Sequence, residues 1–185
     1  MNVLGIVGSP RKDGNSAYLL ERTLSLLPDS FQTETVFLKD HRIEPCEGCH
    51  RCEQDGRCAL DDDMQALYAK LQAADAMILT SPVYMGGLTS RMRAFMERTW
   101  HLRKGQLAGK IGAWIVVGRR KPGAAIYAME DFLSRLGMTR LPGVFGYAFH
   151  KGEILGDEEA LRDIDRLASD LLAQWPSPGS EAPRR

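Results

Sequence analysis

Short apolar runs alternate along the chain with segments in which apolar residues recur every three or four positions. The runs are bounded by turn-forming residues, and most are apolar throughout, as is typical of strands buried on both faces of a parallel sheet. One run, TETVFL, alternates polar and apolar side chains, which predicts a strand nearer the sheet edge. The five predicted strands cover residues 3–7, 33–38, 76–80, 111–117 and 141–147.

A segment of helical periodicity follows each predicted strand. The predicted helices cover residues 16–27, 61–71, 89–102, 124–136 and 157–172. Five consecutive strand–helix units predict an α/β fold, a doubly wound parallel sheet with helices on both faces. Five strands suit the flavodoxin-like order 2-1-3-4-5, in which a ligand binds at the carboxyl ends of the first and third strands.

The length of 185 residues indicates one domain, expected over residues 1–175, with a flexible proline-rich tail over 176–185. Lysine plus arginine and aspartate plus glutamate number 24 each, so no net field favours nucleic acid or an anionic membrane as partner. No apolar run approaches the roughly 20 residues of a membrane span. We therefore expect a cytoplasmic protein, in which thiols stay reduced.

The polar loop GSPRKDGNS follows the first predicted strand and leads directly into a helix. Backbone N–H groups at such a helix start bind anions, and a guanidinium can hold a phosphate by two hydrogen bonds. The loop has neither the dinucleotide glycine pattern nor the Walker pattern, so the single phosphate of FMN fits better than a pyrophosphate. The alternative is an ordinary helix start with a solvated arginine. The candidate phosphate-binding residues are Ser9, Arg11, Gly14, Asn15 and Ser16.

The loop SPVYMGG follows the third predicted strand. A proline ends the hydrogen-bonded ladder, glycines let the backbone approach a flat ligand closely, and a tyrosine can line one face of an aromatic ring. The backbone amides of residues 85–87 could donate to the polar edge of that ring. The alternative is an ordinary loop with the tyrosine in the core. The candidate residues are Pro82, Val83, Tyr84, Met85, Gly86 and Gly87.

Two weaker candidates lie elsewhere. The basic loop GRRKPG follows the fourth strand at the same edge, and it either meets cofactor phosphates or is solvated; Gly118 is its candidate cofactor-binding residue. His101 could donate a proton to a quinone, although a surface histidine is the favoured interpretation. Met92 and Met96 are expected to fill the core or an interface.

The segments GSPRKDGNSAYLL and SPVYMGGLTSRMRAFMERTW resemble the FMN-binding segments of the NADPH-dependent FMN reductase family, within the flavodoxin-like superfamily. With C-x2-C-x2-C-x5-C followed by DDDM, residues 1–150 resemble the iron–sulfur flavoprotein branch of that family. The resemblance implies one FMN per subunit, held by the two loops above, and self-association as a homodimer or homotetramer. It also implies a [4Fe–4S] cluster on four cysteines: Cys46, Cys49, Cys52 and Cys58.

Three interpretations of the cysteines remain open. Four thiolates in one loop have the ligand number and compactness of an iron–sulfur site. Because the loop follows the second strand, it is expected at the same sheet edge as the flavin. A zinc site is disfavoured, since it usually pairs two C-x2-C units across a longer segment, often with histidine. His50 lies between two of the cysteines, where it could hardly share a metal with both neighbours. Free or reversibly oxidised thiols are the third possibility.

These features predict redox chemistry, with no catalytic group expected beyond the flavin. The favoured function passes electrons between FMN and a cluster or a small acceptor such as a quinone or flavin. The donor would be NAD(P)H or a reduced carrier. A cluster-free NAD(P)H-dependent reductase of flavin or quinone is the first alternative, and a non-catalytic flavodoxin-like electron carrier is the second.

Overall fold

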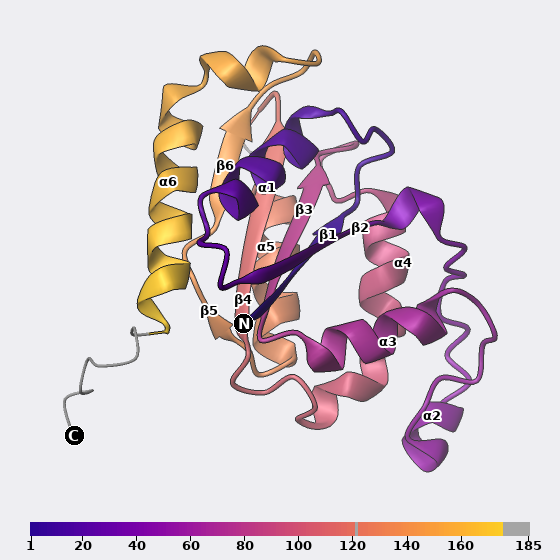
Figure 1. Ribbon diagram of the computed structural model, residues 1–185. Coiled ribbons are helices and arrows are strands. Elements are labelled where there is room, and N and C mark those ends of the chain that lie inside the picture. The colour runs from indigo at the N-terminus through magenta and orange to yellow at the C-terminus, as the bar shows by residue number, and fades with distance from the viewer. Residues whose placement is uncertain (121, 176–185) are drawn as a thin grey trace.

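The apolar runs form one parallel sheet in the computed structural model of the protein (Figure 1). The structure describes residues 1–120 and 122–175, so Lys121 of the basic loop and the predicted flexible tail 176–185 lie outside the described residues. The strands are β1 (Asn2–Val7), β2 (Gln32–Phe37), β3 (Ala76–Pro82), β4 (Ile111–Gly118), β5 (Thr139–Arg140) and β6 (Val144–Tyr147). Their order is β2-β1-β3-β4-β5, with β6 also beside β4, which confirms the predicted flavodoxin-like topology.

The fifth position of the sheet departs from the prediction of one strand over residues 141–147. Two short strands, β5 and β6, both pair with β4, and residues 141–143 separate them. Pro142 lacks the N–H that a ladder needs. Gly143 lies against the indole of Trp114, where an added Cβ would come within 2.0 Å of a ring carbon. The chain therefore breaks where it passes over this tryptophan.

Six helices are present in the described residues, including one that the periodicity did not predict. They are α1 (Asn15–Ser25), α2 (Arg51–Asp55), α3 (Met64–Ala73), α4 (Ser90–Arg98), α5 (Gly123–Arg135) and α6 (Glu158–Ala173). The 3-10 turns are η1 (Leu38–Asp40), η2 (Trp100–Lys104) and η3 (Glu153–Gly156). The predicted helix over residues 89–102 thus ends at Arg98 and continues as η2. No helix among the described residues has the length and apolar character needed to cross a membrane.

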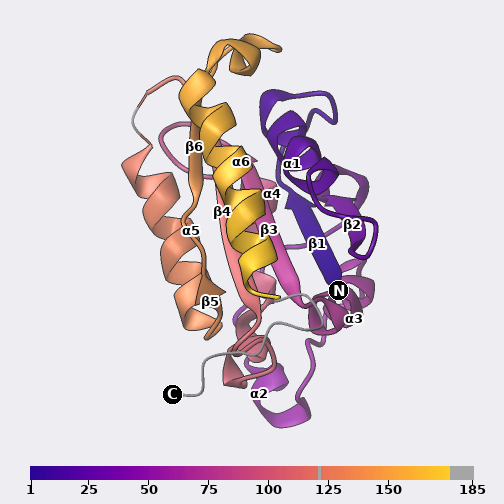
Figure 2. The ribbon, with the colours of Figure 1, turned by 60° about the vertical axis from the view of Figure 1, so that its left-hand side comes forward.

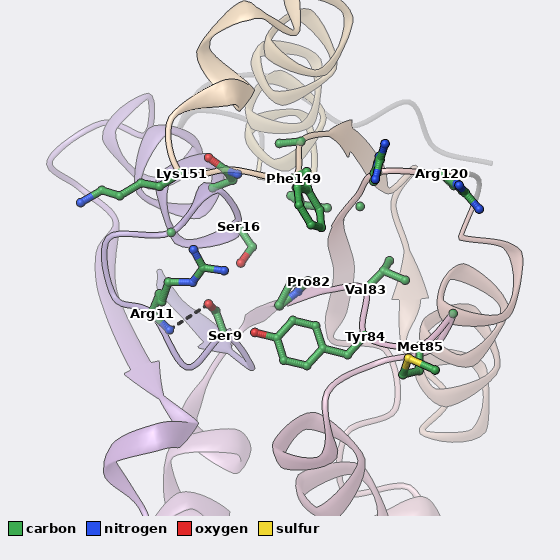
Figure 3. Close-up of a pocket in the computed structure, with 17 residues that line it drawn as sticks. Ser9, Arg11, Ser16, Pro82, Val83, Tyr84, Met85, Arg120, Phe149 and Lys151 are labelled. Carbon is green, nitrogen blue, oxygen red and sulfur yellow. Dashed lines mark hydrogen bonds between the residues drawn. The ribbon is translucent and has the colours of Figure 1, made fainter.

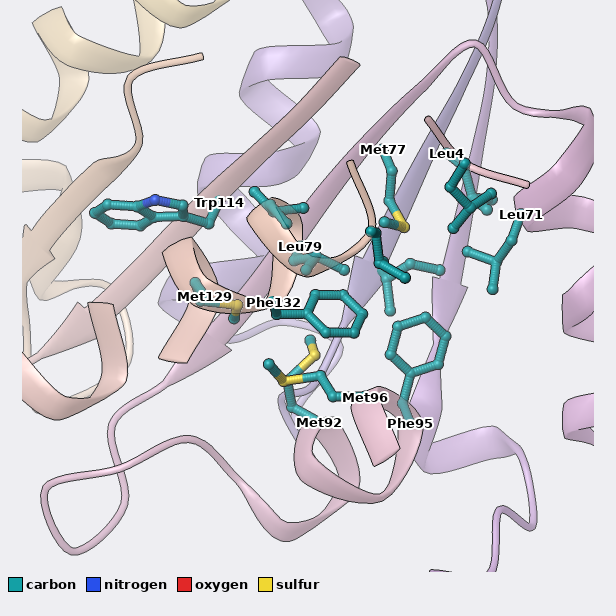
Figure 4. Close-up of a cluster of buried hydrophobic side chains, with 14 of the residues drawn as sticks. Leu4, Leu71, Met77, Leu79, Met92, Phe95, Met96, Trp114, Met129 and Phe132 are labelled. Atoms are coloured by element: carbon teal, nitrogen blue, oxygen red, sulfur yellow. The ribbon is translucent and has the colours of Figure 1, made fainter. Parts of the chain in front are cut away.

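Alternate side chains of each central strand enter two separate cores. Met77 and Leu79 of β3 face α3, α4 and α5 (Figure 4). Ala76 and Ile78 face α1 and α6, which cover the other side of the sheet (Figure 2). Met92 and Met96 belong to the first core, as predicted. Because both faces are covered, the strands are open to a ligand only at their ends.

Candidate cofactor site and cysteine loop

A cavity of about 700 Å³ opens at the carboxyl ends of β1, β3 and β4 (Figure 3). It lies at the topological switch point of the sheet, where this fold class binds ligands. The structure brings eleven of the twelve predicted cofactor-binding residues to its wall: Ser9, Arg11, Gly14, Asn15, Ser16, Pro82, Val83, Tyr84, Met85, Gly86 and Gly118. Gly87 is not on the wall, and its N–H, which was expected to meet the ligand, is bonded to the carbonyl of Tyr84.

Hydrogen bonds hold the loop after β1 in place at the start of α1. The Ser9 hydroxyl accepts a hydrogen bond from the backbone N–H of Arg11 at 3.1 Å. The Thr80 hydroxyl donates to the carbonyl of Ser16 at 3.1 Å, and the Thr89 hydroxyl donates to the carbonyl of Gly8 at 2.8 Å. Thr80 of β3 and Thr89 at the start of α4 therefore fix the position of the loop.

Arg11 is exposed, and among the described residues its guanidinium has no ion-pair partner. Figure 3 shows it turned toward Ser16 at the helix start. The adjacent Lys12 instead pairs with Asp40 at 2.6 Å, outside the cavity. The structure thus leaves one positive side chain of this loop available to an anion at the N-terminus of α1.

The side chain of Asn15 has partners that the sequence did not indicate. Its amide group donates to the carbonyl of His150 at 2.8 Å, and its oxygen accepts from the N–H of Gly152 at 2.8 Å. Lys151 also pairs with Asp13, so the segment after β6 is fastened to the phosphate-loop region at two points. The loops after β1 and β3 form two walls of the cavity, and this segment forms a third wall, which includes Phe149.

The loop after β3 is a tight two-residue turn. Tyr84 and Gly87 exchange two backbone hydrogen bonds of 2.9 and 3.0 Å, and between them Met85 and Gly86 have φ angles of 49° and 81°. Two positive φ values are the signature of a type I′ turn, and a methionine adopts such a value only at a cost. The N–H groups of Met85 and Gly86 have no partner among the described residues. They are available to the polar edge of a ligand.

Tyr84 lies at the cavity and not in the core, because 45% of its surface is exposed. Its ring extends across the cavity toward Ser9 of the other loop (Figure 3). Gly118 is required for this arrangement, since a Cβ there would come within 2.9 Å of the Val83 side chain. The loop after β3 therefore contacts the end of β4 closely.

Sequence reasoning missed several residues of the far wall. Arg119 and Arg120 line the cavity on the side away from Arg11, and the Arg119 guanidinium lies 5.3 Å from the centre of the Phe149 ring. The sequence identifies this basic loop as a candidate but does not decide between contact with cofactor phosphates and solvation. The other unpredicted wall residues are Val117, Ala148, Phe149 and Lys151. The only signal for these residues was their place after the last two strands, at the same edge.

The cysteine loop lies away from this cavity, which corrects the expectation that both share one edge of the sheet. The short helix α2 is bonded to η2, beyond the C-terminal end of α4: the Glu53 carboxylate accepts from Trp100 at 3.3 Å and from Arg103 at 3.2 Å. Figures 1 and 2 both show α2 at the end of the molecule opposite the carboxyl ends of the strands. Residues 41–50 have no regular structure and carry the loop away from β2.

The four cysteines are free, and Cys46 and Cys49 are exposed. Burial raises the pKa of the Cys52 thiol, and the other three thiols, which lie within electrostatic reach of it, raise it further. Gly48 and His50 have positive φ angles of 64° and 56°, which turn the chain sharply between the cysteines.

Cys58 differs from the other cysteines. Burial alone would raise the pKa of its thiol, but the nearby Leu60 backbone and Arg98 guanidinium favour the thiolate and outweigh burial, so the pKa is lowered. Within residues 1–120 and 122–175, no three His, Cys, Asp or Glu side chains form a group ready to hold a metal ion. The four thiols fit a four-iron cluster in number and kind, but in this structure they do not meet around one point.

His101 is buried at 5% exposure, which makes the prediction of a surface histidine wrong. Its ring meets that of Tyr68 edge-on, with 4.6 Å between the ring centres. Burial lowers the pKa of His101, and the nearby Arg98 lowers it further. Because His101 lies in η2 and is not among the wall residues of the cavity, it is not placed to donate a proton to a molecule bound there.

Residues 1–151 match the family described as NADPH-dependent FMN reductase. The protein belongs to this family. It is therefore a member of a family of FMN-dependent oxidoreductases, and its cavity lies where folds of this class bind ligands.

Several relatives of this FMN reductase family member are named iron–sulfur flavoproteins. One from Methanocaldococcus jannaschii is 38% identical, over 66% of this chain and 65% of the relative. One from Methanosarcina thermophila is 35% identical over 75% of each chain. One from Archaeoglobus fulgidus is 35% identical over 96% of this chain and 81% of the relative.

Solved structures that resemble this family member are more distant in sequence. An NADH:FMN oxidoreductase superimposes with a TM-score of 0.71 at 18% identity, covering 99% of this chain and 96% of its own. The Trp repressor binding protein from Bacillus subtilis superimposes with a TM-score of 0.68 at 22% identity, covering 89% and 98%. These likenesses show the shared fold alone.

Proposed function

We propose that the protein is an NAD(P)H-linked oxidoreductase that binds FMN in the cavity and a [4Fe–4S] cluster on its cysteine loop. It would pass electrons between these two groups, or to a small acceptor such as a quinone or flavin. The observation that carries the proposal is the cavity itself, in which the two predicted loops meet at the switch point of the sheet. The names of the relatives support the cluster.

The phosphate of FMN would lie at the start of α1. The backbone N–H groups at the start of α1 and the hydroxyls of Ser9 and Ser16 would meet the phosphate there, and Arg11 would supply the positive charge. Asn15 acts indirectly, because its side chain holds the wall at residues 150–152.

The ring system would lie along Pro82–Gly86. Bound FMN supplies the hydride and electron chemistry, and the protein supplies position and electrostatics. The free N–H groups of Met85 and Gly86 would donate to the polar edge of the ring and favour negative charge there. Tyr84 and Phe149 would limit the access of water to the ring.

The cluster would be held by Cys46, Cys49, Cys52 and Cys58, and it would supply one-electron transfer. Within one chain the two sites lie at opposite ends of the sheet, and an eight-residue strand such as β4 spans roughly 26 Å. Direct exchange between sites so far apart is unfavourable. A homodimer or homotetramer, in which the loop of one copy approaches the cavity of another, would shorten the path.

A cluster-free NAD(P)H-dependent reductase of flavin or quinone is the second candidate. The observation that favours it is the absence, among the described residues, of a group of side chains ready to hold a metal. In that case the thiols would be free or reversibly oxidised.

Anaerobic NAD(P)H oxidation with a soluble quinone tests the reaction, using the wild-type protein and Cys52→Ser. Turnover by the wild type is expected, whereas a non-catalytic carrier would be reduced once without turning over. Cys52→Ser should lose transfer to a one-electron acceptor while it still oxidises NAD(P)H with FMN. Equal one-electron transfer by both proteins would contradict the role of the cluster and support the cluster-free reductase.

A further inference from the structure

The two chain segments that enter and leave the cysteine loop, here called its legs, both contact one buried guanidinium. Arg98, at the end of α4, is only 2% exposed. Its Nη1 donates to the carbonyl of Glu44 at 2.9 Å and to the Asp62 carboxylate at 2.5 Å, and its Nη2 donates to the same carboxylate at 3.0 Å. Glu44 lies two residues before the first cysteine, and Asp62 lies four residues after the last.

The Asp62 carboxylate joins the legs a second time. It accepts hydrogen bonds from the backbone N–H of Glu44 at 2.9 Å and of Met64 at 3.0 Å. The Arg98 and Asp62 side chains are 0% and 1% exposed, so this ion pair is fully buried. A buried ion pair is weak evidence for stability, because apolar replacements are often as stable. Its geometry points instead to fixing the separation of the two legs.

One donor of this guanidinium remains unused. The Nε–H of Arg98 has no hydrogen-bond partner among the described residues, and leaving such a buried donor unpaired is costly. Cys58 is partly buried against the first core and lies near the guanidinium of Arg98. A thiolate, or a thiolate bound to iron, accepts hydrogen bonds better than a thiol does. A ligating Cys58 is therefore the partner that this environment lacks.

We propose that Arg98 and Asp62 are the positioning residues of the cysteine site: the pair clamps Glu44 to residues 62–64, and the free Nε–H of Arg98 donates to the sulfur of Cys58. The clamp reduces the chain entropy that is lost when four thiols converge on one centre. The hydrogen bond stabilises negative charge on that sulfur. This inference rests on the proposed cluster.

The principal test compares Arg98→Lys with the wild type, both reconstituted anaerobically with iron and sulfide. Lysine keeps the positive charge but cannot span Glu44 and both Asp62 oxygens, and it leaves no further N–H for Cys58. We expect iron to be lost to a chelator at least tenfold faster, and the reduction potential of the remaining cluster to fall. FMN affinity should not change. Arg93→Lys, an exposed site on the same helix, is the matched control.

A second measurement needs no cluster. In the protein loaded only with FMN, hydrogen exchange at the amides of Glu44 and Met64 should be at least tenfold faster in Arg98→Lys than in the wild type, since both amides are bonded to Asp62. If Arg98→Lys fails to fold, Gln65→Met replaces it. Gln65 donates to the carbonyls of Cys58 at 3.0 Å and Leu60 at 2.6 Å, so its loss loosens one leg without burying a charge.

The outcomes separate this inference from the proposed function. Wild-type rates of iron loss and amide exchange in Arg98→Lys would overturn the positioning role while the cluster stands. A wild-type protein that takes up no iron would overturn the cluster, and with it the role of Arg98 toward Cys58. In that case faster exchange in the variant would show that the ion pair stabilises the fold but has no role at a cluster.

Discussion

Replacing Arg11 by alanine should weaken FMN binding by about tenfold. A hydrogen bond to a charged group contributes about 1.5–3 kcal/mol. Arg11 is exposed, so solvent screens its charge, and the lower end of that range applies. A loss of about 1.4 kcal/mol is a factor of ten in the dissociation constant. The hydroxyls and backbone N–H groups of the loop remain in place, so binding should be weakened and not abolished.

The assay is a fluorescence titration of the flavin-free protein with FMN and with riboflavin, which lacks the phosphate. Arg11→Ala should lose affinity for FMN alone. Lys12→Ala is the matched control, because Lys12 is the adjacent cation and is paired with Asp40 outside the cavity. An equal loss for riboflavin, or an unchanged affinity for FMN, would refute the assignment of the phosphate to this loop.

Three further changes test other parts of the structure. Asn15→Ala removes two hydrogen bonds worth about 0.5–1.5 kcal/mol each, so limited proteolysis should cut residues 148–153 faster. An unchanged rate of cleavage would contradict the role of Asn15 in holding the third wall. Gly118→Ala places a Cβ within 2.9 Å of Val83 and should destabilise the fold by about 1–3 kcal/mol in urea unfolding, with weaker FMN binding. The folded-state pKa of His101 lies below the ordinary value of 6.5, so the unfolded chain binds more protons and stability should fall as the pH drops below about 6.5. His101→Phe should flatten that dependence in urea unfolding, and an equally steep loss in both proteins would contradict it.

The fold was predictable because the relevant signals are local. Apolar runs and helical periodicity identified the strands, and the rule that parallel strands carry ligands at their carboxyl ends brought the two loops together correctly. The break at residues 141–143 has one local signal, Pro142, but the contact of Gly143 with a tryptophan nearly thirty residues earlier was not predictable. The third wall was missed for the same reason, since the partners of Asn15 lie at residues 150–152.

The position of the cysteine loop shows where the rule fails that loops after parallel strands gather at one edge of the sheet. A short connection stays near the strand that it follows, but the segment between β2 and α3 exceeds twenty residues and can reach the opposite end of the sheet. Its position depends on contacts of Glu53 and Asp62 with the end of α4 and with η2, which no local pattern encodes. The burial of His101 has the same origin, because η2 replaces the expected end of the helix.

The amounts of FMN, iron and acid-labile sulfide per chain, measured after anaerobic reconstitution, test the central claim most directly. We predict one FMN with about four iron and four sulfide in the wild type, as a [4Fe–4S] cluster requires. Cys52→Ser should retain the FMN and lose the iron and sulfide, because its loop is remote from the cavity. A wild-type protein that binds FMN but no iron would contradict the cluster, and one that binds no FMN would contradict the cofactor site itself.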